Sequence, residues 1–321
     1  MIKACGHFAI VCTVLYDNKI ITMAKHCHDF IAGNVLVVYV IMSHAFMRSH
    51  VHVLLVNLAV ADIAFLVCCV PFQVHRYAKV QWVFGDAFCK ITQFVIYVTL
   101  YVTIWTLVSI AVLRCYVVIW NKNMRMSGTR YVAVYTALLW LMLAALSLPY
   151  VLFHEQQVSG AYTYCGVAQH HERLVATTLF VSTYLLPFSL IVTAYTAVLR
   201  YLRKQSMTRR LRRRDTRVSR GIITVVACFV LAWFPYHAYS LVSAYLNLEH
   251  GVADQLTRII CHTLAFSNSL VNPFIYNYSC REFRRAFRHL LRCRDANCPI
   301  SNKRGNANSS HFPLTDYTPR E

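Results

Sequence analysis

Long apolar runs constrain the fold of this chain more than any other feature of its sequence. A helix that crosses a membrane needs about 20 consecutive, mostly apolar residues, and inside lipid it satisfies its own backbone hydrogen bonds. Seven runs of this kind lie at residues 30–46, 51–76, 87–118, 131–151, 174–202, 218–246 and 256–278. The sequence therefore predicts an all-α membrane protein, a seven-transmembrane helix bundle, with one transmembrane domain over residues 33–279.

The composition argues in the same direction. Apolar and aromatic residues make up 57% of the 321 residues and charged residues only 14%, well below the roughly 25% charged residues of soluble domains. The net charge is +19, but so much apolar sequence leaves little exposed basic surface of the kind that binds nucleic acid. A soluble enzyme and a nucleic-acid-binding protein are therefore both poor fits.

The first run is the weakest of the seven. Its apolar part starts at Gly33 and is short, and four polar residues within residues 25–29 precede it. An earlier apolar patch, residues 8–16, is too short to span a membrane and lacks the cleavage site of a signal peptide. We therefore set residues 1–32 apart as a doubtful segment, an incorrect or truncated start. An unusual but genuine first helix is the alternative.

Basic residues alternate between the two sides of the predicted bundle. Residues 200–220 carry ten Lys and Arg, residues 281–294 carry six, and residues 119–130 carry three, whereas residues 154–174 and 246–258 carry one each. The basic side is cytoplasmic by the positive-inside rule. We therefore expect a multi-pass membrane protein with its N-terminus outside and its C-terminus in the cytoplasm.

The sequence after the last span changes character twice. Residues 280–294 form an amphipathic pattern, which predicts a short cytoplasmic helix on the inner leaflet. Cys293 at its end is a candidate for palmitoylation, and an unmodified cysteine on a surface helix is the alternative. Residues 295–321 are polar and predict a disordered tail. The apolar face of the amphipathic pattern consists of Phe283, Phe287, Leu290 and Leu291.

Polar residues inside the spans are costly in lipid, and each is a functional hypothesis. Asp62 lies in the middle of the second span, and amides and a hydroxyl lie in other spans. Together they form a candidate pocket around a cation. The alternative is a set of interhelical hydrogen bonds of about 0.6 kcal/mol each. The candidate residues are Asp62, Asn34, Thr103, Asn268 and Asn272.

Arg114 lies at the cytoplasmic end of the third span, and Asp215 lies at the cytoplasmic end of the sixth. An ion pair between them that breaks on activation would be a two-state switch. The alternative is a solvated Asp215 among basic residues.

Most of the thirteen cysteines lie in spans or at cytoplasmic ends, whereas Cys89 and Cys165 both fall on the predicted extracellular side. The exterior is oxidising, so a disulfide between them is plausible, and it would pin the intervening loop over the bundle.

Catalysis has no candidate in this sequence. No Ser-His-Asp pattern, phosphate-binding loop or pair of glycosidase carboxylates stands out, and no Cys/His spacing supports zinc. We expect a protein that is not an enzyme.

Short sequence signatures in the predicted spans match those of a known family. The chain resembles the rhodopsin-like, or class A, G-protein-coupled receptors from Gly33 onward, because a series of short signatures occurs in order and in register. They are GN at Gly33–Asn34, NLAVAD ending at Asp62, Trp82 seven residues before Cys89, Arg114 twenty-five residues after Cys89, Trp140, Pro187 with Tyr195 eight residues later, FVLAWFP over residues 229–235 and NPFIY over residues 272–276.

Within that family the chain looks like a neuropeptide receptor of the kisspeptin, galanin and allatostatin-A group. The stretches LVCCVPFQ, WVFGDAFCK, SNSLVNP and FRRAF carry this resemblance. RCYVVIW and the double cysteine of VCCVPF look most like kisspeptin-type receptors.

The resemblance implies roles for the residues above. Cys89 and Cys165 would form the family's disulfide, and the polar set around Asp62 would line its sodium pocket, with no other cofactor. The remaining roles concern activation, in which the sixth helix moves outward to admit a heterotrimeric G-protein. The residues that would rearrange are Arg114, Asp215, Ile104, Pro187, Phe229, Trp233, Tyr195 and Tyr276.

Two departures from the family pattern bear on signalling and on the doubtful segment 1–32. The acid that usually precedes the switch arginine is Leu113 here, which removes one restraint on Arg114. The only N-glycosylation sequons, at Asn277 and Asn308, fall on the predicted cytoplasmic side, whereas family members usually carry an external one. A non-signalling or decoy receptor, or a truncated gene product, is therefore an alternative to an active receptor.

The ligand class follows by exclusion within the family. The aminergic receptors use an Asp where this chain has Ile96, and the opsins need a Lys where it has Phe266. An extracellular peptide remains as the ligand. An amidated peptide C-terminus needs hydrogen-bond partners more than charge, and Gln and His side chains can serve as such partners. Ordinary helix packing is the alternative role for each candidate contact. These contacts are Gln73, His75, Gln93, Tyr97, Tyr236, His237, Arg258 and His262.

The expected function is that of a plasma-membrane receptor for a neuropeptide. Resemblance to kisspeptin-type receptors implies coupling to a Gq-type protein, and resemblance to galanin receptors implies a Gi-type protein. Arrestin, a receptor kinase and membrane lipid are further expected partners. A membrane transporter is the remaining alternative, although no internal repeat supports it.

Overall fold

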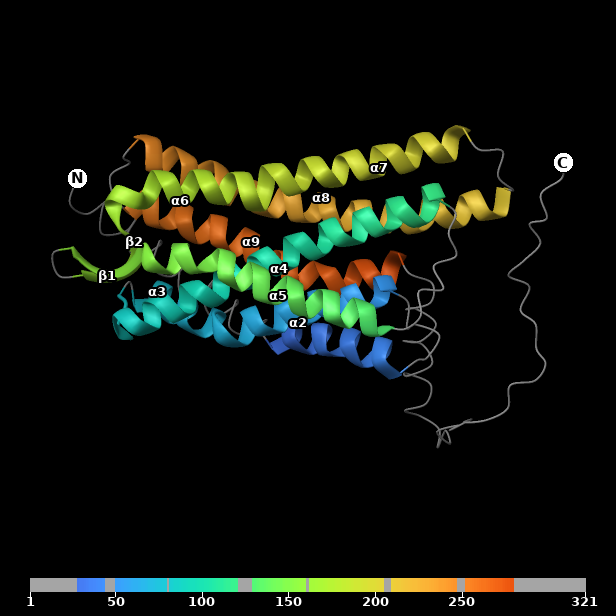
Figure 1. The fold of residues 1–321 in the computed structure, drawn as a ribbon. Coiled ribbons are helices and arrows are strands. Elements are labelled where there is room, and N and C mark those ends of the chain that lie inside the picture. Colours follow the sequence, from blue (N-terminus) through green and yellow to red (C-terminus); the bar gives the residue numbers. More distant parts are fainter. Residues whose placement is uncertain are drawn as a thin grey trace, which may run out of the picture.

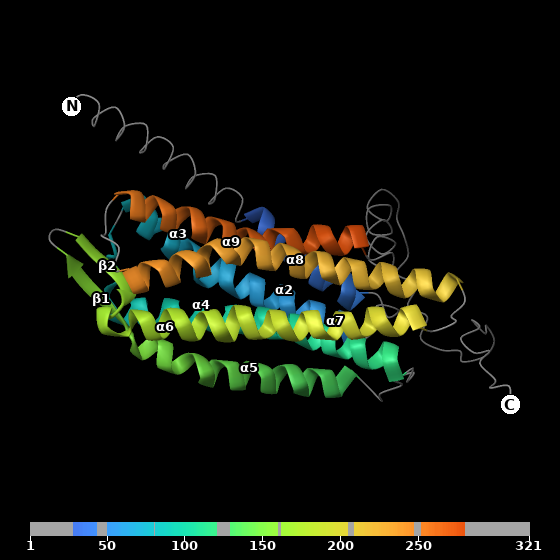
Figure 2. The same ribbon diagram turned by 90° about the horizontal axis from the view of Figure 1, so that it is seen from above.

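The computed structural model describes residues 28–43, 50–79, 81–120, 129–159, 162–204, 209–246 and 252–279. Nearly all of them are helical, and the helices run side by side along one direction (Figure 1). A β-hairpin covers one end of this bundle, called the hairpin end below. At the other end, the far end, α7 and α8 project beyond their neighbours in both views (Figures 1 and 2).

The helices follow the predicted apolar runs closely. The first is the short apolar helix His28–Ser43. The second run folds as α2 (His50–Cys68) and α3 (Val70–Lys79), which are separated at Cys69, just before Pro71. Proline lacks the N–H that a helix interior needs, so a break is expected there. α4 (Gly85–Trp120), α5 (Thr129–Leu152) and α9 (Val252–Ser279) are continuous.

The fifth and sixth runs are less regular. The fifth is one long helical segment made of η2 (Gln169–His171), α6 (Glu172–Leu179), a π-helical turn η3 (Phe180–Leu185) and α7 (Leu186–Lys204). The sixth run is α8 (Arg209–Leu246), which contains Pro235 in its interior.

Three features differ from the sequence prediction. The first helix begins at His28, five residues inside the segment that was set apart as doubtful. α8 begins at Arg209 rather than at residue 218, because its basic first turns are good helix formers although they are not apolar. The chain also contains two strands, β1 (His154–Ser159) and β2 (Tyr162–Val167), which the all-α prediction did not include. They pair antiparallel, with His154 opposite Val167 and Ser159 opposite Tyr162.

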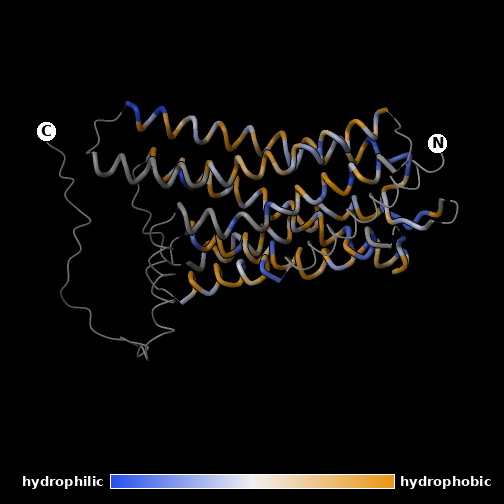
Figure 3. The backbone as a smooth tube through the Cα atoms, turned by 180° about the vertical axis from the view of Figure 1, so that it is seen from behind, coloured by the Kyte–Doolittle hydropathy of each residue, from blue (hydrophilic) through white to orange (hydrophobic). Residues whose placement is uncertain are grey.

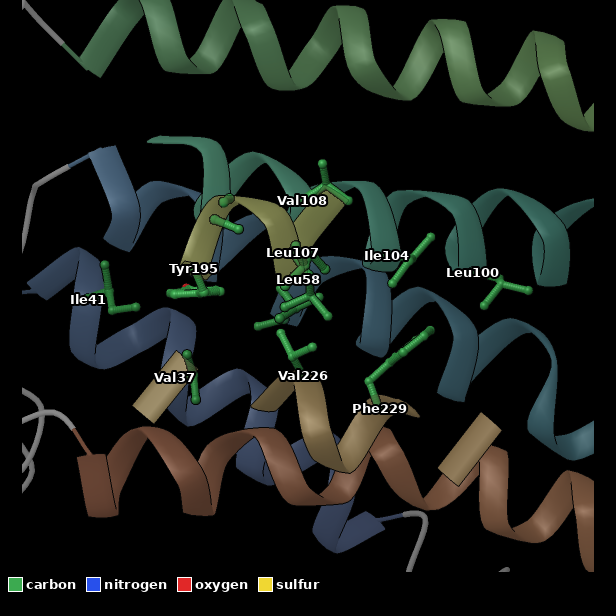
Figure 4. Close-up of a cluster of buried hydrophobic side chains, with 14 of the residues drawn as sticks. Val37, Ile41, Leu58, Leu100, Ile104, Leu107, Val108, Tyr195, Val226 and Phe229 are labelled. Carbon is green, nitrogen blue, oxygen red and sulfur yellow. The ribbon is translucent and has the colours of Figure 1, made fainter. Parts of the chain in front are cut away.

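Apolar side chains fill the bundle interior and also cover its outside. One buried cluster joins residues of the helix His28–Ser43, α2, α4, α7 and α8, among them Ile104, Tyr195 and Phe229 (Figure 4). On the outside, Leu138 and Leu141 of α5 are more than half exposed. Hydrophilic residues mark the far end of α7 (Figure 3). Within the described residues, five helices are long and apolar enough to cross a membrane, and an apolar exterior along their length is what lipid requires.

Polar side chains inside the bundle pair across helices. Asn57 of α2 donates from Nδ2 to the Thr106 hydroxyl of α4 at 2.8 Å and accepts a bond from Trp140 Nε1 of α5, also at 2.8 Å. Tyr101 of α4, which is fully buried, shares hydrogen bonds with the Tyr150 hydroxyl at 3.0 Å and the Ser182 hydroxyl at 2.6 Å. α4 is therefore tied by side chains to α2, α5 and the π-helical turn.

Candidate functional site

The hairpin is fixed over its end of the bundle by several independent contacts. Cys89, in the first turns of α4, and Cys165 of β2 form a disulfide with their Cα atoms 5.5 Å apart. The Gln156 backbone N–H of β1 donates to Asp86 of α4 at 2.9 Å. The Trp82 N–H donates to the Thr163 carbonyl of β2 at 2.7 Å. Both strands are therefore anchored, one to α4 directly and the other through the disulfide and the turn before α4.

His154, the first residue of β1, makes a further anchor. Its Nδ1 lies 2.6 Å from the Tyr150 carbonyl, and its Nε2 lies 3.1 Å from the Tyr97 hydroxyl. A carbonyl can only accept, so Nδ1 carries the proton and Nε2 accepts from Tyr97. The pKa of His154 is lowered from 6.5 to about 4, mainly by burial and also by the positive charge of Arg76, against the opposing effect of the hydrogen bond to Tyr150. The imidazole therefore stays neutral at physiological pH and holds β1 against α4 and α5.

The eight predicted ligand contacts fall into two groups in space. The first group, on α3 and α4, lies beside the hairpin and is largely engaged with it or buried. Tyr97 bonds His154, and Gln93 Nε2 donates to Cys165 Sγ at 3.7 Å. Gln73 is buried, and the ring of His75 packs edge-on against Phe84 with centroids 4.9 Å apart.

The second group lies on α8 and α9 near the hairpin end. Tyr236 faces His262 across the two helices, whereas the buried His237 packs against Phe180 and Tyr184 of the fifth segment. The Tyr236 ring packs against His237, His262 and Trp233, with centroid distances of 5.2, 5.1 and 5.6 Å. Trp233, Tyr236 and His262 form a continuous aromatic surface that begins at Trp233 deep in the bundle, and the buried ring of His237 packs on Tyr236.

Arg258 of α9 belongs to the second group but is held by neighbouring residues. Its Nε donates to Asp254 Oδ2 at 3.0 Å and its Nη2 to the Ser243 hydroxyl of α8 at 3.1 Å. Its guanidinium also lies 5.4 Å from the centre of the Tyr239 ring. Arg258 therefore joins α8 to α9 at the hairpin end.

A cavity lies below this aromatic surface, between α2, α4, α8 and α9. It contains three of the five residues predicted to bind sodium, Asp62, Thr103 and Asn268, together with Trp233. Five lining residues were not predicted, and since four of them are apolar, nothing in their type marked them. They are Phe65, Ile96, Thr99, Leu100 and Ala265.

The polar floor of the cavity offers oxygen atoms to a cation. Asp62 accepts a hydrogen bond from Asn272 Nδ2 of α9 at 2.9 Å, between residues 210 positions apart in sequence. The buried Oδ1 of Asn268 accepts no hydrogen bond from the described residues. Carboxylate, amide and hydroxyl oxygens suit hard cations, so these residues fit a sodium ion. Asn34 is buried as well, and its Nδ2 donates to the Phe30 carbonyl of its own helix at 3.0 Å.

The structure describes the side chains of six of the predicted switch residues. Phe229 stacks on Trp233 with ring centroids 5.8 Å apart, and Phe229, Ile104 and Tyr195 share one buried cluster. Arg114 is partly buried and interacts electrostatically with Tyr195, which links α4 to α7 toward the far end. Pro187 is buried at the start of α7. The side chains of Asp215 and Tyr276 lie outside the described residues, as does the whole of residues 280–321 with Cys293.

Comparison with known proteins identifies the family. The sequence profile of the 7 transmembrane receptor (rhodopsin family) matches residues 33–276. The chain belongs to this family. Human galanin receptor type 3 is 34% identical over 74% of the chain and 67% of the relative. The allatostatin-A receptor of Bombyx mori is 32% identical over 82% of the chain and 76% of the relative, and rat galanin receptor type 2 is 32% identical over 80% and 71%.

Membership in this receptor family accounts for the arrangement described above. A class A receptor of the neuropeptide type is what the sequence resemblance predicted, and that prediction is confirmed at the family level. The helices long enough to cross a membrane agree with a multi-pass membrane protein. The similarity to kisspeptin-type receptors stays a prediction. Among the described residues, no group of three or more His, Cys, Asp or Glu could hold a metal ion together.

The lowered pKa of His154 gives the receptor a testable pH dependence. The unfolded histidine takes up a proton near pH 6.5 and the folded one only near 4, so the stabilisation is complete above pH 6.5 and is lost as the pH falls toward 4. A pKa shift of this size changes the free energy of unfolding by at most about 3 kcal/mol over this pH range. We expect the melting temperature of the purified receptor to fall between pH 7 and 4.5. The melting temperature of the His154→Gln receptor should fall less over the same range, because glutamine cannot be protonated.

The control is His28→Gln, which changes an exposed histidine and leaves the pH profile of melting as in the unmodified receptor. If the His154→Gln receptor loses as much stability on acidification as the unmodified one, the assignment of this pH dependence to His154 is wrong.

Proposed function

We propose that this chain is a plasma-membrane receptor for an extracellular neuropeptide, with its hairpin end outside the cell, and that it signals to a heterotrimeric G-protein. The observation that supports the proposal best is the anchored hairpin above an aromatic surface that leads down to Trp233 and the Asp62 cavity. The names of its relatives, galanin receptors and an allatostatin-A receptor, support a peptide as the ligand.

In the proposed mechanism the peptide enters beside the hairpin and places its end on the aromatic surface of α8 and α9. The rings of Tyr236 and His262 combine apolar faces with polar atoms, which suits an amidated C-terminus. Peptide binding favours the conformation in which α8 bends outward at its far end, so the receptor population shifts toward that conformation. The G-protein then binds the opened far end.

Leu113 supports a specific property of the resting state. The family's acid beside the switch arginine is absent at this position, so Arg114 loses one restraint in the resting conformation. The resting receptor then depends more on its other contacts, and basal signalling is correspondingly higher than in relatives that keep the acid. A decoy receptor that binds peptide without signalling is the second candidate, because Leu113 is also a departure from the family's activation motif.

Gq-type and Gi-type proteins are both candidate partners, with arrestin, a receptor kinase and membrane lipid as further ones. A transporter is less well supported than a receptor, because the sequence shows no internal repeat of the kind that paired transporter halves carry. Ion flux in a reconstituted bilayer would reveal a transporter.

The proposal is tested by expressing the chain in cells with surface staining and measuring calcium and cyclic AMP. Galanin-like, allatostatin-A-like and kisspeptin-like peptides are applied, each amidated and as the free acid. We expect a response to an amidated galanin-like or allatostatin-like peptide, with calcium release indicating Gq and lowered cyclic AMP indicating Gi. A receptor that is present at the surface, binds peptide and stays silent would be a decoy. Silence together with no peptide binding would contradict the proposal.

We also propose that the Asp62 cavity binds an allosteric sodium ion, held by Asp62 with Thr103 and Asn268. A cation that binds the resting conformation better must weaken peptide binding, because coupling between two sites is reciprocal. Replacing choline with sodium at constant ionic strength is therefore expected to lower peptide affinity roughly fivefold or more. Asp62→Asn removes the charge but keeps an oxygen for Asn272 to donate to, and it should abolish the sodium effect.

The affinity of the Asp62→Asn receptor in choline serves as the control for folding. If this receptor binds peptide normally in choline and still responds to sodium, the ion does not bind at Asp62.

A further inference from the structure

The π-helical turn η3 brings an unusual polar contact to the middle of α8. Tyr184, in this turn, donates a hydrogen bond from its hydroxyl to the backbone carbonyl of Val230 at 3.3 Å. The ring is held in place by His237 and Phe180, with centroids 5.1 and 5.8 Å away, and by Phe234 at 6.5 Å. The hydroxyl is therefore aimed at one point of the α8 backbone by packing on both sides.

That point lies beside the proline of α8. Pro235 has no N–H, so the carbonyl of Leu231 lacks its helical donor, and a helix bends most easily in such a turn. Val230 lies one residue farther toward the basic far end of α8. The Tyr184 hydroxyl thus holds the backbone on the far-end side of the bend, which is the part that must move if α8 opens.

Other contacts hold the opposite part of α8. The Tyr245 hydroxyl lies 3.1 Å from the Thr177 hydroxyl of α6, and Arg173 Nε donates to the Ala244 carbonyl at 3.2 Å. Both lie on the hairpin-end side of Pro235. The fifth segment therefore contacts α8 on both sides of the bend. The Tyr184 bond holds the far-end part, which moves when α8 bends outward, whereas the Tyr245 and Arg173 bonds hold the hairpin-end part, which does not.

We infer that the Tyr184–Val230 hydrogen bond is a restraint on receptor activation: it stabilises the resting position of the far-end part of α8 and must break when that part moves outward. Tyr184 is a positioning residue that sets the level of basal signalling. This inference rests on the proposed signalling function. With Leu113 in place of the family's acid, the resting conformation relies more heavily on this bond.

The direct test is Tyr184→Phe, which keeps the ring and removes only the hydroxyl. A net hydrogen bond of this kind shifts an equilibrium by roughly 2- to 10-fold, so agonist-independent nucleotide exchange in membranes should rise by that factor. Tyr245→Phe is the matched control, because it removes a tyrosine hydroxyl between the same two segments on the other side of Pro235. It should leave basal exchange unchanged.

A rescue separates the hydrogen bond from any effect on packing. Replacing Tyr184 with p-aminophenylalanine restores a donor at the same position, and basal exchange should return to the level of the unmodified receptor. An increase in the Phe variant that the amino variant does not reverse would overturn the proposal, as would a Phe variant with unchanged basal exchange and normal surface expression.

A second readout keeps this test independent of the G-protein. A fluorophore is attached through Arg212→Cys at the far end of α8, in a background without other reactive cysteines, and its emission reports the position of α8 in purified receptor. If no G-protein responds, the proposed function fails, but the fluorophore still decides the inference. A shift in emission with Tyr184→Phe and none with Tyr245→Phe supports it, and equal emission from all three receptors overturns it.

Discussion

The arrangement of this receptor depends on how α4 satisfies its polar side chains in an apolar interior. Three polar side chains of this helix bond three different neighbours. Tyr97 bonds His154 of β1, and Tyr101 bonds Tyr150 and Ser182 of the neighbouring helices. Thr106 accepts a bond from Asn57 of α2. A buried polar group without a partner is costly, so each of these bonds strongly favours one relative position of its two elements. α2, α4, α5 and the hairpin are in this way fixed to one another as a frame.

α8 and α9 are joined to that frame differently. Arg258 ties them to each other at the hairpin end, and Asn272 ties α9 to Asp62 of α2 across the cavity. The interior of α8 contains Pro235, and its contacts with the fifth segment lie on both sides of that residue. A receptor can convert binding at one end into movement at the other when a fixed frame lies beside a helix that bends easily at a proline. The cavity with Asp62 and Trp233 lies where the two parts meet.

Much of this fold could be predicted from the sequence, because apolar length alone determines where a chain crosses lipid. The hairpin could not, since HEQQVS and YTYCGV show no clear alternation of apolar and polar residues. Its shape depends on contacts with α4 and on the disulfide, which are distant in sequence. The start of α8 was missed for a related reason: Arg-rich turns continue a helix outside the apolar window.

The candidate site was predicted less evenly. Asp62, Thr103 and Asn268 line one cavity, and the sequence could group them because a polar residue in a span needs a polar partner in another span. Tyr97 and Gln93 were expected to face a ligand, but a polar residue near the end of a span can equally face a loop, and here both contact residues of the hairpin. The roles of Tyr101 and Tyr184 depend on hydroxyl positions in space, and no spacing in the sequence indicates them.

The central claim is that peptide binding moves α8 relative to a fixed frame built on α4. Spin labels on the far ends of α8, α4 and α5, in receptor held in lipid nanodiscs, measure this directly by double electron–electron resonance. The account predicts that an activating peptide lengthens the distance between the α8 and α5 labels and leaves the distance between the α4 and α5 labels unchanged. An unchanged α8 distance at saturating peptide, or an equal displacement of α4, would contradict it.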